Sequence, residues 1–342
     1  MNNLCFQGLS GNWTAEVSAV LILCYDCDEN FTCDALIHLI RHFIHNTFKK
    51  VIIIMSSLAV LLLCVFQVIA MKVEKLYRDQ HNLQQFVVDK QSGEIFVGGQ
   101  NSLIRLSSGL DLIQLIKTGP KLDSPKCPPP QMPCNTTKSW INSFTKGLVL
   151  DYDSSTVILC TNLHQGSCQI RLMRDISFLK KEIYKPIVGH IPDPFDVLLI
   201  APGVNGNVLY IGSKYSNINQ EEEMKVYRDM VPHLSSRDLE KLEFSYRDEI
   251  GATKVSLLDQ YRMDYQVNFI YGFTHGKYVF FITTQAKSID NNAIQTKIVR
   301  ICSQDKYFKS YVEFHYFVTR IKTSHTLLQR ELTSRNRPIS CM

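Results

Sequence analysis

The sequence predicts an all-β fold made of repeated antiparallel units, and three observations support this prediction. Between residues 83 and 314, short apolar segments alternate with turn-forming sequences. A strand–turn–strand pattern recurs along this region, with equivalent positions at Gly98, Cys160, Gly212 and Thr283. Aromatic residues make up 10% of the chain, including 15 Tyr and 18 Phe, and they favour strands over helices.

The first unit contains four short apolar runs separated by turns. The segments 90–93 and 107–109 are rich in Gly, Ser and polar residues, which interrupt the alternation and indicate turns. We therefore expect an antiparallel meander with strands at 86–89, 94–98, 103–106 and 110–116.

The second unit carries two closely spaced cysteine pairs. Cys127 and Cys134 lie in a Pro-rich segment that precedes the unit, and Cys160 and Cys168 flank a polar stretch that ends in Gly166. That stretch predicts a tight turn. We expect two strands between the pairs, at 148–151 and 156–160, joined by a turn at 152–155.

The spacing of these four cysteines favours disulfides over a metal site. Cys134 and Cys160 are too far apart in sequence for a compact zinc knuckle, and neither pair has the Cys-x-x-Cys spacing. We predict Cys127–Cys134 and Cys160–Cys168 bridges, with metal as the alternative, and none of the four as a catalytic residue. Disulfides require an oxidising compartment. Asn135 begins an Asn-Thr-Thr sequon, and we expect it to be glycosylated.

The third and fourth units repeat the pattern with longer connections. The stretch 220–241 is strongly charged, and Ser235 and Ser236 predict the cap of one helical turn at 237–241. Long loops on a rigid β scaffold often bind partners, and a solvated loop is an equal alternative. The expected strands are 197–200, 208–212, 267–272, 277–283, 296–302 and 310–314.

Four-stranded units that repeat in this way favour a β-propeller. The alternative is a β-sandwich in which the spacing is coincidental. We favour the propeller because the strand–turn–strand pattern recurs in all four units.

The amino-terminal part differs from these units. Residues 1–50 contain Cys24, Cys27 and Cys33 followed by three histidines, and we favour an amphipathic helix over a zinc site there. Residues 51–71 form an uncharged apolar run long enough to span a bilayer. We predict a cleaved signal peptide, with an uncleaved signal-anchor in the membrane as the alternative. Either way we expect residues 72 onward to be exported.

Composition and motifs exclude several classes of function. The net charge is only +5, and no basic stripe with interleaved aromatics is present, so we expect no nucleic-acid partner. The sequence contains no P-loop, no Gly-x-Ser-x-Gly and no His-Glu-x-x-His motif. His164, His190, His233 and His275 are scattered along the chain. We therefore predict no catalytic residues, no metal and no cofactor.

Several longer motifs are distinctive: TGPKLDSPKCPPP at 118–130, LVLDYDSSTVILC at 148–160 and QGSCQ at 165–169. They continue through LLIAPG, LYIG, PHLSSRDL at 232–239 and TKIVRICSQDKYFKSYVEF at 296–314. On these motifs, the sequence from about residue 82 to residue 314 resembles the sema domain of plexins, the cell-surface receptors for semaphorins. Within the family, we expect an insect-type class A or B.

The resemblance implies a seven-bladed propeller that binds a semaphorin sema domain at the cell surface or as a secreted protein, in axon guidance. We expect 72–314 to be a partial sema domain of about four blades, and 315–342 to be a divergent tail without the family's later modules. On the same grounds we expect Cys302 to be unpaired, because the family's later cysteine is missing. An incomplete ring is also expected to be unstable.

We expect semaphorin binding to use charged and aromatic residues on the insertions of the third and fourth units. Two other possibilities are a β-propeller enzyme with its active site in the central channel and a fragment without function. The expected partner-binding residues are Lys214, Tyr215, Asn217, Arg228 and Arg237.

Overall fold

The computed structural model describes residues 75–78, 82–130, 132–192, 196–214, 227, 230–261, 265 and 267–315. Those from residue 82 onward lie in one compact unit, His81–Met342. The expected segments 1–50 and 51–71, and residues 316–342 of the expected tail, lie outside the described residues. No helix in the described part of the chain has the length and apolar character needed to cross a membrane.

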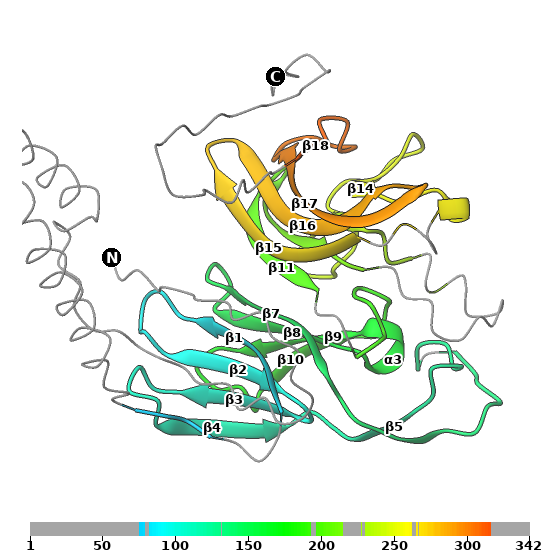
Figure 1. Ribbon diagram of the computed structural model, residues 1–342. Coiled ribbons are helices and arrows are strands. Elements are labelled where there is room, and N and C mark those ends of the chain that lie inside the picture. Colours follow the sequence, from blue (N-terminus) through cyan, green and yellow to red (C-terminus); the bar gives the residue numbers. More distant parts are fainter. Residues whose placement is uncertain are drawn as a thin grey trace, which may run out of the picture. The chain divides into compact units, whose positions relative to one another are not determined.

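The first sheet is a four-stranded antiparallel meander, as predicted (Figure 1). Short polar connections join its strands, and Gly93 adopts a positive φ of 73° in the first of them. All five residues of the second strand are buried, which shows that both faces of the sheet are covered there. The strands are β1 (Leu83–Val88), β2 (Ile95–Gly99), β3 (Ser102–Leu106) and β4 (Leu112–Lys117).

The second sheet has the same topology and contains the two strands predicted between the cysteine pairs. Its second connection, between β8 and β9, is the short turn α3 (Leu163–Gly166), where the sequence predicted a tight turn. The strands are β7 (Thr145–Asp151), β8 (Thr156–Thr161), β9 (Cys168–Leu172) and β10 (Leu179–Ile183).

The third sheet corrects two details of the sequence prediction. The turn expected at 201–207 is shorter, because pairing continues as far as Gly203 opposite Gly206. Ser235 and Ser236 do not cap a helical turn; they lie inside a buried strand. Their backbone groups pair with those of the neighbouring strand β12 instead of with each other along a helical turn. The strands are β11 (Val197–Gly203), β12 (Gly206–Gly212), β13 (Leu234–Arg237) and β14 (Lys254–Val255).

The fourth sheet contains the longest strands, and its order matches the predicted one. The central hairpin continues past the expected ends, with pairing as far as Ser288 opposite Asn291. The strands are β15 (Val267–His275), β16 (Tyr278–Ser288), β17 (Asn291–Cys302) and β18 (Val312–His315).

Alternate residues of single strands belong to different cores, which distinguishes a propeller from a sandwich. In β8, Val157 and Leu159 pack into a core shared with the first sheet. Ile158 and Cys160 of the same strand pack into a core shared with the third sheet. A third core joins the third and fourth sheets around Phe281. Each consecutive pair of sheets is therefore packed face to face.

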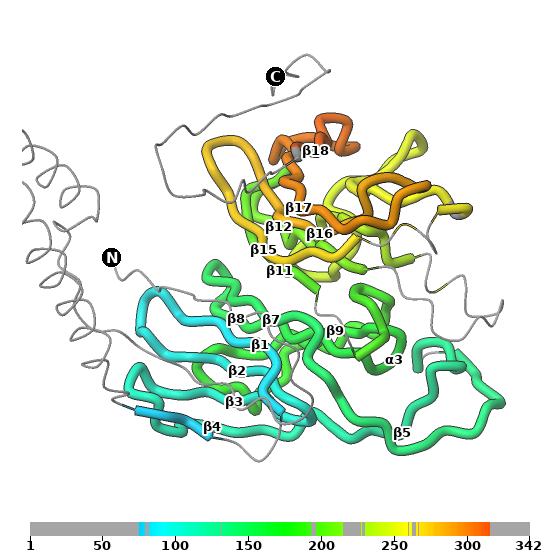
Figure 2. The backbone as a smooth tube through the Cα atoms, in the orientation of Figure 1, coloured from blue at the N-terminus to red at the C-terminus, as the bar shows by residue number. Residues whose placement is uncertain are grey.

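The first strand of each sheet contacts the first strand of the next, in the order β1, β7, β11 and β15. Figure 2 follows the backbone through the four sheets in this order, from cyan to orange. Sheets that meet along their first strands and stack through their faces form the blades of a β-propeller. The described residues thus contain four blades, in agreement with the predicted partial propeller.

Candidate partner-binding surface

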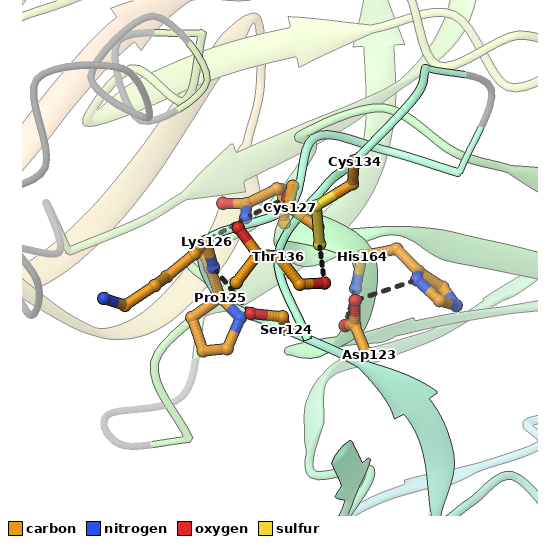
Figure 3. Close-up of a disulfide and its surroundings, with 9 residues drawn as sticks. Asp123, Ser124, Pro125, Lys126, Cys127, Cys134, Thr136 and His164 are labelled. Atoms are coloured by element: carbon orange, nitrogen blue, oxygen red, sulfur yellow. Dashed lines mark hydrogen bonds and ion pairs between the residues drawn. A yellow bond between two sulfur atoms is a disulfide. The ribbon is translucent and has the colours of Figure 1, made fainter. Parts of the chain in front are cut away.

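The connection between the first two sheets forms a hairpin of its own. Its strands β5 (Lys121–Asp123) and β6 (Ser139–Ile141) pair antiparallel. Between them runs a Pro-rich loop that is closed by the predicted Cys127–Cys134 disulfide (Figure 3). The loop is therefore constrained twice at its base, by the pairing of β5 with β6 and by the disulfide.

The turn α3 lies against this hairpin and is itself closed by the second predicted disulfide, Cys160–Cys168. His164 and Gln165 have positive φ angles of 52° and 64°, followed by Gly166 at 89°. A Cβ at Gly166 would collide with the carbonyl oxygen of Val188. Glycine is required here for both its backbone angle and its size.

Asp123 joins the hairpin to the turn (Figure 3). The backbone N–H of His164 donates to Asp123 Oδ2 at 2.8 Å, and His164 Nδ1 lies 3.4 Å from Oδ1. Burial alone would raise the pKa of Asp123, but the hydrogen bonds from His164 outweigh it and lower that pKa below its usual value. The carboxylate therefore stays ionised and holds the turn in place.

Gln165 makes the second link between the two disulfide-closed segments. Its Nε2 donates to the carbonyl oxygens of Pro125 and Cys127, at 2.8 and 2.7 Å. Its side chain is 4% exposed. A buried amide with two partners fixes the loop backbone relative to the turn.

A salt bridge fastens the hairpin to the edge strand of the second sheet. Lys121 Nζ lies 3.0 Å from Glu182 Oε1. Glu182 also accepts hydrogen bonds from Tyr184 at 2.6 Å and from Gln169 at 2.9 Å. Partial burial of Glu182 raises its pKa, and these hydrogen bonds more than reverse that effect. The hairpin is thus held at both β10 and α3.

The connection between β12 and β13 meets the disulfide loop. Tyr227 Oη donates to Met132 Sδ at 3.1 Å. Lys214, one of the expected partner-binding residues, is half-buried two residues after the end of β12. Tyr215, Asn217 and Arg228 lie outside the described residues.

Arg237 is not where the sequence analysis expected it. It lies in β13 with 6% exposure, and its guanidinium donates to the carbonyl oxygens of Leu242 and Met230, both at 3.3 Å. The Phe244 ring lies over the guanidinium, 4.0 Å from ring centroid to Cζ. Burial lowers the pKa of Arg237 to about 10. The expectation that this residue contacts a partner directly is wrong, because its polar atoms are used inside the fold.

Two other expectations concern Cys302 and Asn135. Cys302 is disulfide-bonded, so the expectation that it is unpaired is wrong. The four other described cysteines pair among themselves, and the partner of Cys302 therefore lies outside the described residues. Asn135 is exposed on the disulfide loop, which makes its sequon accessible. Its glycosylation stays a prediction.

Within the described ranges, no three His, Cys, Asp or Glu side chains are grouped so that they could hold a metal ion. The sequence analysis found the cysteines but missed Asp123, His164 and Gln165, whose contacts join segments about forty residues apart in the chain. The QGSCQ motif was the available signal for the turn.

Comparison with known proteins gives no matching family model, but it gives clear relatives. Human Plexin-A4 is 28% identical over 272 residues, which cover 73% of this chain, and zebrafish Plexin A3 is 29% identical over 280 residues, which cover 72%. Mouse Plexin-A2 is 28% identical over 267 residues. The homologues of this chain are therefore A-type plexins.

Structural comparison agrees with the plexin homology. A structure titled as the full extracellular region of plexin A4 superposes with a TM-score of 0.58 at 26% identity, covering 68% of this chain and 27% of that one. The chain spans 14% of the length of the plexin relatives. The plexin homology confirms the resemblance seen in the sequence, whereas the insect-type class stays a prediction.

Proposed function

We propose that this chain acts as an extracellular, non-enzymatic module that binds the sema domain of a semaphorin, in plexin-type signalling and axon guidance. The observation that carries the proposal is the shared fold and 26% identity with the extracellular region of plexin A4. The two disulfides fit an exported protein. The export signal at 51–71 belongs to this proposal, and amino-terminal sequencing of the secreted protein tests it.

We place the contact with semaphorin on the connection that follows β12, next to the disulfide loop. Lys214, Tyr215, Asn217 and Arg228 are the proposed contact residues. The support is the position of this insertion after β12, whose last five residues are buried and provide a rigid base for a binding loop. Arg237 keeps an indirect role, since its bonds hold the segment that leads into β13.

The test is a binding measurement between the secreted full-length chain and a semaphorin ectodomain at low and high ionic strength. Lys214→Glu should slow association, and more at low salt than at high salt, because charges near the surface steer encounter and salt screens them. Lys287→Glu makes the same charge change at an exposed position of β16 and serves as the control. Absence of binding by the wild-type chain would refute the proposed function. Equal effects of the two variants would refute only the assignment of Lys214.

A further inference from the structure

The β5–β6 hairpin has two chemically different faces. Directly opposed residues of an antiparallel pair share a face, and successive residues alternate. Lys121 and Asp123 therefore share the face that reaches Glu182 and His164. Leu122 and Trp140 are paired on the opposite face.

That opposite face is apolar and exposed. Leu122 is 52% exposed, and Trp140 is 74% exposed. Tryptophan is usually well buried in a folded domain, and at protein interfaces it is among the residues that contribute most to binding. Two opposed apolar side chains at such exposure form an uncovered pair rather than a single surface residue.

The hairpin that displays this pair is fixed from behind. Its inner face is bound to α3 and β10, and its loop is closed by a disulfide. A preformed anchor loses little conformational freedom when a partner binds, which increases the affinity available from a small contact. The outer pair is thus presented on a rigid support.

The charges that flank the two strands in the chain are positive. Lys138 immediately precedes β6, Lys117 ends β4 with three residues between it and β5, and both are exposed. Among the described residues, neither side chain forms an ion pair. The acidic group of this hairpin, Asp123, is buried on the other face. A partner with carboxylates around an apolar side chain complements this arrangement.

We propose that the outer face of the hairpin, the Leu122–Trp140 pair with Lys117 and Lys138, is a docking surface for an acidic protein segment that inserts an apolar side chain against Trp140. This partner is additional to the semaphorin of the proposed function. A second copy of the chain is disfavoured as the occupant, because a two-fold contact would bring the same lysines together.

The experiment selects a displayed library of random peptides on the secreted full-length chain and removes the peptides that also bind the Trp140→Ala variant. The retained peptides should carry Asp or Glu next to an apolar residue. Synthetic copies of them should lose about tenfold or more in affinity for Trp140→Ala, and should weaken for Lys117→Glu/Lys138→Glu. Ile250→Ser, which changes another exposed apolar residue, should leave their binding unchanged.

Several outcomes would overturn the proposal. Retention of no peptide, or of peptides without acidic residues, removes the acidic partner. A sedimentation change that disappears in Trp140→Ala assigns the face to a second copy, and heparin binding that depends on Trp140 assigns it to a polysaccharide. Loss of semaphorin binding in Trp140→Ala makes the face part of the semaphorin site. Unchanged urea unfolding of the variant shows that each result reflects the surface. The Asn135→Gln chain is tested in parallel so that a glycan cannot mask binding.

Discussion

The buried pair of Lys146 and Asp196 offers a sharp test of how the blades are joined. Lys146 is the second residue of β7, the first strand of the second sheet, and Asp196 immediately precedes β11, the first strand of the third sheet. Their side chains are 2% and 0% exposed, and Nζ lies 3.9 Å from Oδ2. The backbone N–H of Gly189 also donates to Asp196 Oδ2 at 2.9 Å. The pair thus links two adjacent blades near their common axis.

Replacement of Lys146 by Met keeps the apolar stem and removes the cation. Removal of one partner of a buried ion pair costs about 3–5 kcal/mol, since the other charge is left uncompensated. Such a loss is a large part of the about 5–15 kcal/mol that stabilises a typical domain. The double variant Lys146→Met/Asp196→Asn should recover part of this loss, because an amide needs no counter-ion and can still accept from Gly189.

The pH dependence follows from Asp196. Burial raises the pKa of Asp196 from 3.8 to about 6, even though Lys146 acts to lower it. A carboxyl whose pKa is raised in the folded state contributes most to stability below its unfolded pKa. That contribution is lost as pH rises from about 4 through about 6. Without Lys146 the pKa rises further, so the cost of Lys146→Met should be smaller near about pH 5 than at about pH 7.5.

The assay is urea unfolding of the secreted full-length chain, with disulfides intact, followed by far-ultraviolet circular dichroism. Tryptophan fluorescence is a poor probe, because Trp140 is already exposed in the folded state. Lys287→Met at an exposed site is the control and should change stability little. A pH-independent cost, or a double variant that loses the full sum of the two single losses, would refute the ion-pair reasoning.

Three further predictions concern the second sheet and its neighbouring loops. Replacing Cys160 and Cys168 together by Ser should lower the unfolding free energy by about 2–3 kcal/mol, measured by urea unfolding, because the closed loop constrains the unfolded chain. Gly166→Ala should lower the unfolding free energy more than Gly206→Ala. Both positions have a positive φ, which costs alanine about 1–2 kcal/mol, but only at Gly166 would the new Cβ collide with a carbonyl oxygen. Equal losses would show that this close approach does not matter. Asn135→Gln should increase the electrophoretic mobility of the secreted chain as much as glycosidase treatment does, and no difference from wild type would show that the sequon is unused.

The repeated sheets could be predicted from the sequence because the signals are local. Alternation of apolar residues and turn composition located all four hairpins of first and second strands, and the short separations within the two cysteine pairs indicated their pairing. The errors at strand ends came from the same local view. The pairing of Ser288 with Asn291, for example, depends on the neighbouring strand and on little in the residues themselves.

Burial of charged residues could not be predicted in the same way. Arg237 lies in a stretch rich in charge, and nothing in that composition shows that its guanidinium meets the carbonyl oxygens of Leu242 and Met230. Cys302 is a similar case, because it forms a disulfide with a cysteine outside the described residues. The residues near Arg237 in the sequence do not show that its guanidinium folds back onto backbone carbonyls, and the composition around Cys302 does not show its disulfide.

The packing of the sheets explains why the two proposed surfaces lie on connections. A strand such as β8 is buried along its whole length, so its residues are fixed by the two cores on either side. The β5–β6 hairpin lies outside those cores and is held by ion pairs, buried amide contacts and a disulfide. Because its attachment uses the polar inner face, the outer face can remain apolar without being needed for folding. Substitutions at Leu122 and Trp140 are therefore expected to change binding by this face and to leave the blades intact.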